Sequence, residues 1–60
     1  MASGSYYKMY SDNQGYWRWT FYAANHEPIA VSSEGYVHRR DCEHSIGLVK
    51  ASYDSPVYAP

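Results

Sequence analysis

Cysteine occurs once in this chain of 60 residues, at Cys42, so no disulfide can form within the chain. Apolar runs are short as well, and none approaches the ~18 residues needed to cross a membrane. No secretory signal is recognisable at the start of the sequence. A lone cysteine without such a signal predicts a protein of the reducing cytoplasm that has no contact with membranes.

The chain has almost no excess of charge of either sign. Five basic and six acidic residues give a net charge of −1, and Arg39-Arg40 is the one adjacent basic pair. Nucleic-acid-binding domains usually carry a basic patch or stripe, because contacts to the phosphate backbone supply much of their affinity. The composition therefore does not favour nucleic acid as a partner.

The length limits how much surface the chain can bury. Sixty residues form one domain at most, and a domain of this size buries only ~60% of its unfolded surface, which leaves it marginal without a further stabilising contact. Because no disulfide can supply that contact, association of two copies is the expected alternative. Residues 1–5 are expected to form a loose leader, and residues 6–60 a single domain.

Aromatic residues are what the sequence has in excess: eight Tyr, two Trp and one Phe. Trp17, Trp19 and Phe21 fall at alternate positions, and alternation with period two is typical of a strand with one buried face. One aromatic side chain can bury ~150–250 Å². This strand is therefore expected to supply most of the core, together with Ile46 and Val49 from a later helix.

Further strand patterns lie on both sides of the tryptophan strand. Polar clusters with Asn, Asp, Gly or Pro separate them, as is typical of short hairpin loops. Periodicity does not decide which face of the first strand is buried, because both of its faces are partly apolar. Three strands in succession predict an antiparallel meander. The predicted strands are residues 6–10, 16–24 and 29–32, with turns at 11–15 and 25–28.

The period changes after His38. Cys42, Ile46 and Val49 lie at i, i+4 and i+7, which is typical of an amphipathic helix with a narrow apolar stripe. Residues 56–60 follow this region and could add a short fourth strand. The predicted fold class is α+β: a three-stranded antiparallel meander followed by one helix packed on one face, with a possible short C-terminal strand.

Four groups of residues carry a family resemblance that covers residues 7–56. They are Tyr10-x-Asp12-x-x-Gly15-x-Trp17-Arg18-Trp19, then Ala24-Asn25, then Ile29-Ala30-x-Ser32-x-Glu34-Gly35-Tyr36, and last Cys42 with Ile46-x-x-Val49-Lys50. Together they resemble the YegP-like family (UPF0339), short bacterial and archaeal proteins of unknown function. The resemblance implies a meander with a helix packed across it. It also implies that single-copy members pair as homodimers, which mimic members built from two copies of the unit, and it supplies no catalytic residues.

Three positions depart from the family pattern. The family often has glycine where this chain has His26, and glycine adopts a positive φ more easily. His38 stands at the helix N-cap, where Ser or Thr is usual and caps better. Ser45 replaces a glycine that is common before the helix isoleucine. These departures bear on loop geometry and on the start of the helix rather than on the fold.

His38, Cys42 and His44 lie close enough in sequence to raise the question of a metal site. His38 and Cys42 can share a helix face, but His44 lies ~160–200° round the helix from Cys42. Structural zinc usually takes four ligands with short spacings at both ends of the site. We therefore expect a buried structural Cys42, two surface histidines, and neither a metal nor another cofactor. A buried thiol and the absence of room for a closed pocket also predict that the protein is not an enzyme.

Tyrosine and basic side chains gather on the strand faces turned away from the proposed core. Tyr and Arg are typical anchors of protein interfaces, sheet-based binders stack nucleic-acid bases on such faces, and exposed cross-strand pairs need no function at all. The expected function is a homodimeric binding or structural module without catalysis; the alternative is a weak binder of single-stranded nucleic acid or peptide. The candidate interface or ligand face consists of Tyr6, Lys8, Tyr10, Tyr16, Arg18 and Tyr22.

Overall fold

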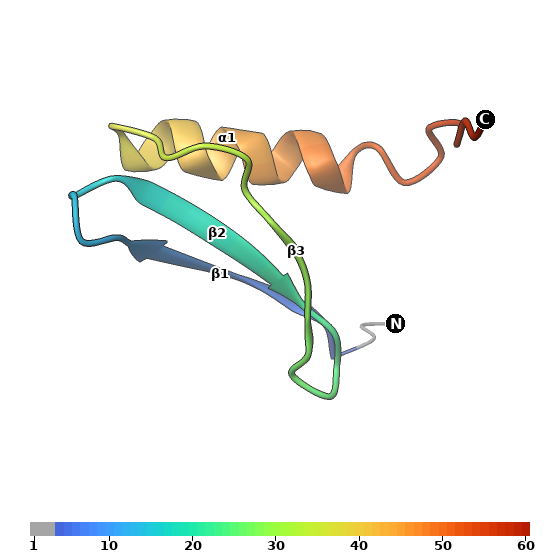
Figure 1. Cartoon of the computed structure of the whole chain (residues 1–60), viewed down its shortest axis with the longest axis horizontal. Helices are drawn as coiled ribbons and strands as arrows, with labels where there is room; N and C mark the ends of the chain where they lie inside the picture. Colours follow the sequence, from blue (N-terminus) through green and yellow to red (C-terminus); the bar gives the residue numbers. More distant parts are fainter. Residues whose placement is uncertain (1–3) are drawn as a thin grey trace.

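A computed structural model describes residues 4–60, and in it three strands precede one helix. The strands pair antiparallel in one sheet of order β1-β2-β3, and the helix crosses one face of that sheet (Figure 1). The predicted α+β meander with one helix is confirmed, whereas residues 1–3 of the expected leader lie outside the described residues. The elements are β1 (Tyr6–Ser11), β2 (Trp17–Tyr22), β3 (Pro28–Val31) and α1 (Arg39–Lys50).

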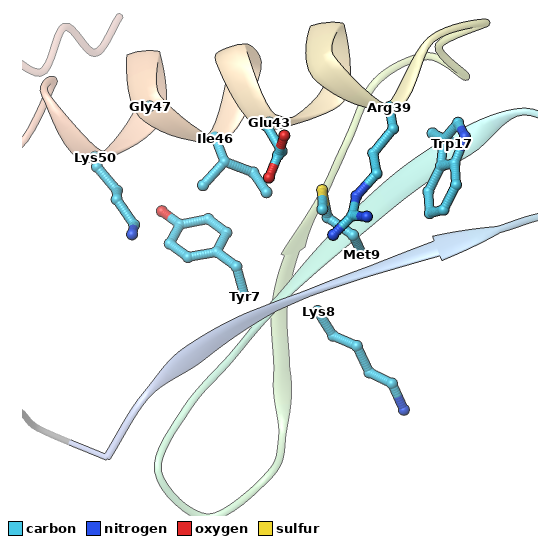
Figure 2. Close-up of a pocket in the computed structure, with 9 residues that line it drawn as sticks. All are labelled: Tyr7, Lys8, Met9, Trp17, Arg39, Glu43, Ile46, Gly47 and Lys50. Atoms are coloured by element: carbon cyan, nitrogen blue, oxygen red, sulfur yellow. The ribbon is translucent and has the colours of Figure 1, made fainter.

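Cross-strand pairing decides which face of β1 is buried. Tyr7 lies opposite Phe21 and Met9 lies opposite Trp19, and residues directly opposite each other share a face of the sheet. Figure 2 shows Tyr7 and Met9 rising from β1 toward α1, while Lys8 points to the other side of the sheet. The helix therefore covers the face that carries the tryptophans, and the opposite face is the one that Lys8 shares.

A small core joins the sheet to the helix. Trp19 and Cys42 are its buried apolar side chains in the described part of the chain, with 6% and 0% of their surface exposed. The Trp19 indole Nε1–H donates to Ser45 Oγ at 2.9 Å, and the Ser45 hydroxyl donates to the Cys42 carbonyl at 2.7 Å. The predicted burial of Trp19 and Cys42 is confirmed. The prediction that Val49 is buried is wrong. The helix is oriented about its axis so that Cys42 faces the sheet, which leaves Val49 41% exposed.

The ends of α1 follow the sequence in one respect and depart from it in another. His38 is the N-cap residue and makes no side-chain capping bond, as its weak capping chemistry predicts. After α1 the chain turns and continues past the helix, away from the sheet (Figure 1). Residues 56–60 have no regular structure, so the predicted fourth strand is not formed within the chain.

Two glycines make a matched test of this packing. A Cβ at Gly35 would lie 2.6 Å from the Cβ of Tyr16, whereas a Cβ at Gly47 would meet nothing within 4 Å. We expect Gly35→Ala to lower the free energy of unfolding by about 1–3 kcal/mol through overpacking. Gly47→Ala should instead raise it by up to about 1 kcal/mol, because alanine is the better helix former. Urea unfolding of both variants checks the pair, and equal effects of the two would contradict the packing described.

Candidate functional site

Two surfaces of the molecule are candidates for function, one on each side of the sheet. The first is the tyrosine face, on the side away from α1; the second is a groove between β1 and α1. The structure brings the six predicted site residues together on the first. The tyrosine face consists of Tyr6, Lys8 and Tyr10 from β1, Arg18 and Tyr22 from β2, and Tyr16 just before β2.

Many groups of the tyrosine face already have partners within the chain. The rings of Tyr6 and Tyr22 stack with centroids 5.1 Å apart. The Tyr6 hydroxyl is hydrogen-bonded to Nδ1 of His26 at 2.8 Å, in a turn where His26 adopts a φ of 71° despite its Cβ. Arg18 Nε donates to Asp12 Oδ2 at 2.6 Å. Part of the face is therefore fixed by its own contacts, while Tyr6, Tyr10 and Tyr16 remain exposed to a similar degree, at 37%, 39% and 40%.

Asp12 organises the turn that joins β1 to β2. Its Oδ1 accepts the backbone N–H groups of Gln14 and Tyr16, both at 2.9 Å, while its Oδ2 accepts from Arg18. The bond from Arg18 is the largest cause that lowers the pKa of Asp12 below its ordinary 3.8, followed by the backbone bond from Tyr16. The sequence predicts a turn at residues 11–15 but not this ion pair, which only the folded hairpin brings together.

The lowered pKa of Asp12 predicts a pH dependence of stability. A carboxylate whose pKa is lower in the folded state stabilises the fold above its unfolded pKa, and loses that contribution as the pH falls through the folded value. The free energy of unfolding should therefore fall as the pH drops below about 4 in the native protein, and less steeply in Asp12→Asn. Urea midpoints across that range check this. The same slope for both proteins would contradict the role given to Asp12.

The second surface is an open groove of about 720 Å³ between β1 and α1 (Figure 2). Its floor is apolar and aromatic, and its helix side is charged. The Arg39 guanidinium lies 5.7 Å from the centre of the Trp17 ring, and Lys50 Nζ lies 5.6 Å from the centre of the Tyr7 ring. The residues that line the groove are Tyr7, Lys8, Met9, Trp17, Arg39, Glu43, Ile46, Gly47 and Lys50.

The groove was not predicted from the sequence, because only the apolar stripe through Cys42, Ile46 and Val49 was considered for the helix. A signal was present nevertheless: Arg39, Glu43, Ile46 and Lys50 follow each other at spacings of four, three and four residues. That row is a second helical stripe, beside the one through Cys42. The structure turns this row toward the rings of β1 and β2.

The histidines and the cysteine do not form a site in the described structure. Across residues 4–60 no three His, Cys, Asp or Glu side chains lie close enough together to hold a metal ion. Cys42 is fully buried, and burial is the main cause that raises the pKa of its thiol, with the charge of Glu43 adding to it. A thiol in this state is a poor nucleophile. α1 has 12 residues, and no helix within residues 4–60 has the length and apolar character that crossing a bilayer requires.

The chain is a small α+β protein: an antiparallel meander with one helix across it, an open groove beside β1 and a tyrosine face on the other side. The family model described as a domain of unknown function (DUF1508) matches residues 12–58. UPF0339 proteins of Neisseria meningitidis serogroups B and A are each 43% identical to this chain over 47 residues, which are 78% of this chain and 82% of theirs. The chain therefore belongs to the DUF1508 (UPF0339) family, and the YegP-like resemblance is confirmed.

A solved structure shares the fold. The NMR solution structure of a protein from Haloferax volcanii superimposes with a TM-score of 0.82, covering 93% of each chain. Its sequence is 21% identical to this one, so the likeness concerns the fold alone. The family's function is unknown, and the function of this chain has to be argued from its own surfaces.

Proposed function

We propose that the protein is a self-association module without catalysis, in which two copies form a homodimer through the groove between β1 and α1. In this dimer, residues 55–60 of each copy lie in the groove of the other copy, alongside β1. The observation that carries the proposal is the amount of surface that one chain leaves exposed.

The exposed area of the chain is too large for a compact monomer. Its solvent-accessible surface is 4973 Å², whereas a folded monomer of 6.9 kDa is expected to expose about 4,000 Å². The excess of about 1,000 Å² is close to the ~800 Å² that each partner buries in an interface of standard size. One further chain is therefore enough to bring the exposed area to the value of a compact protein.

The two edges of the sheet differ in a way that favours β1 as the place of contact. β1 is six residues long and has no proline and no bulge, whereas β3 is four residues long, starts with Pro28 and pairs with β2 through a register shift at Phe21/Tyr22. Short strands, prolines and bulges are the usual protection of an edge against pairing with another chain. Because β3 is protected and β1 is not, an assembly through β1 closes at two copies.

The segment after α1 carries exposed apolar side chains and follows an acidic residue, a chemistry that complements the groove. Val57 and Tyr58 are 93% and 88% exposed, and their segment continues away from its own sheet (Figure 1). An extended segment can add to a free strand edge through main-chain hydrogen bonds while its side chains fill pockets. The groove offers Arg39 and Lys50 at its two ends, and Asp54 precedes the segment with the opposite charge.

The tyrosine face is the less favoured interface, although its residues are typical of interfaces. Tyr6, Tyr22 and Arg18 are engaged within the chain, whereas the groove combines a free strand edge with partly exposed rings. Catalytic groups often have shifted pKa values. In this chain the shifted pKa values belong to the Asp12–Arg18 ion pair and to the buried Cys42 thiol. None of these groups lines the groove, which supports a role without catalysis.

The experiment that tests this proposal is isotope-filtered NMR on a mixture of labelled and unlabelled chains. Contacts between chains should connect the Val57 methyl groups with Met9 and Ile46 in the groove. Intermolecular contacts from the tyrosine face instead, or none at concentrations where two copies associate, would reject the groove as the interface.

A further inference from the structure

A second hollow lies at the end of the β1–β2 hairpin, apart from the proposed dimer groove. It has a volume of about 430 Å³ and is lined by Tyr10, Ser11, Asp12, Asn13 and Gln14. Volumes of this order are typical of sites that take one small ligand group. No residue that lines this hollow also lines the groove between β1 and α1.

The walls of the hollow are rigid and carry free recognition groups. Both oxygens of Asp12 are engaged, by two backbone N–H groups and by Arg18, so this carboxylate is neutralised and the turn is fixed. The Tyr10 ring is 39% exposed and stacks on no other ring of residues 4–60. The side-chain amides of Asn13 and Gln14 likewise have no hydrogen-bond partner among those residues.

Cations stand beside the ring. Arg18 lies directly opposite Tyr10 in the sheet and uses its Nε–H for Asp12, which leaves the terminal N–H groups of the guanidinium for another acceptor. Lys8 lies two residues before Tyr10 on the same face and makes no ion pair within the described residues. A free aromatic ring and two unpaired amides therefore line the hollow, and two cations lie beside Tyr10 on the tyrosine face, outside its lining.

We propose that this hairpin-end hollow binds one unstacked base of a single-stranded nucleic acid. The base stacks on Tyr10, as bases do on aromatic side chains of sheet-based binders. The amides of Asn13 and Gln14 offer both donors and acceptors to the edge of the base. Lys8 and the free N–H groups of Arg18 receive the adjoining phosphate.

The charge of the whole chain sets the expected strength of this binding. A net charge of −1 excludes the strong attraction that strongly basic proteins have for nucleic acid. The local cations and the ring are instead expected to give weak binding, with a dissociation constant on the order of 10⁻⁴ M at low salt. Weak binding of this kind is consistent with the net charge of −1 and is best followed residue by residue.

The test is an NMR titration of the full chain with a short single-stranded oligothymidine at low salt. The expected result is shifts of the backbone amides of Ser11, Asn13 and Gln14 and of both side-chain amides. Absence of shifts, or shifts confined to the residues of the β1–α1 groove, would overturn the proposal. Thymidine monophosphate, which carries one base and one phosphate, should shift the same amides, whereas equal shifts with inorganic phosphate alone would overturn the assignment to a base.

Two variants distinguish the contribution of the Tyr10 ring to binding from that of the Lys8 charge. Tyr10→Ala should weaken binding about ten-fold, while Tyr53→Ala, which removes an exposed tyrosine beyond α1, should leave it unchanged. Lys8→Gln should lower the slope of binding affinity against salt by about one. If Tyr10→Ala proves unfolded by circular dichroism, Asn13→Ala provides the same test at an exposed turn position, with weaker binding expected and unchanged binding contradicting the site. Solution mass measured on the same samples distinguishes loss of this site from failure of the dimer.

Discussion

Replacing Trp19 with alanine is expected to remove most of the free energy of unfolding. The cooperative thermal transition of the variant should then lie near room temperature or be lost. The Trp19 side chain is buried, packs edge-on against the Tyr7 ring with centroids 5.5 Å apart, and donates its indole N–H to Ser45. Truncation of a buried tryptophan costs about 3–5 kcal/mol, and the whole stability of a domain is only about 5–15 kcal/mol. Thermal unfolding followed by circular dichroism measures the loss directly.

Trp17→Ala is the matched control for this prediction. Trp17 shares a strand and a face with Trp19, but it is only partly buried and borders the open groove. Its truncation removes less buried surface and should leave a folded protein with a lower melting temperature. A melting temperature that is unchanged in Trp19→Ala, or a larger loss in Trp17→Ala, would show that the core lies elsewhere.

Replacing Val57 with aspartate is expected to separate the dimer while leaving each chain folded. Val57 is almost fully exposed in the single chain, so the substitution costs the fold nothing. In the dimer it replaces an apolar contact with the aromatic floor of the groove by a carboxylate that loses its hydration, and Arg39 and Lys50, which already lie over the Trp17 and Tyr7 rings, offset only part of that cost. We expect the dissociation constant to rise by at least about 30-fold, which corresponds to about 2 kcal/mol.

Val37→Asp is the control for the interface. Val37 is also an exposed valine, but it lies before α1 and does not line the groove. This variant should dimerise like the native protein. Light scattering over the same concentration range measures the solution mass of both variants. Dissociation of both variants, or of neither, would contradict the proposed interface.

Most of the architecture could be predicted because the sequence signals it locally. The alternation of Trp17, Trp19 and Phe21 and the polar turns on either side define the meander, and Cys42 with Ile46 marks the helix face. The buried face of β1 could not be predicted, because Tyr7 with Met9 and the tyrosines on the other side are similarly apolar. Only their register against β2 assigns them to a face.

The rotation of α1 was also beyond the sequence. Val49 follows the apolar stripe, yet the hydrogen bond between Trp19 and Ser45 fixes the helix so that Val49 lies at the margin. The same rotation turns Arg39 and Lys50 toward the rings of the sheet. Helical periodicity identifies the buried stripe only to within a residue or two. For a short helix with a narrow stripe, it therefore does not determine the orientation of the helix about its own axis.

The candidate site was predicted in part. All six residues of the predicted face lie on one side of the sheet: alternation groups them within each strand, and the register between β1 and β2 brings the two groups to the same face. The prediction that this face is an interface stays a prediction. The groove required the packing of α1 on the sheet, and the fixed hairpin end required the bond between Asp12 and Arg18, which lie six residues apart.

The measurement that tests the central claim most directly is the solution mass of the native protein, by light scattering over a concentration series. The account predicts about 14 kDa, twice the 6.9 kDa of one chain, with no larger species because β3 is a protected edge. A mass near 6.9 kDa at every concentration would contradict the homodimer and leave the groove open to another partner.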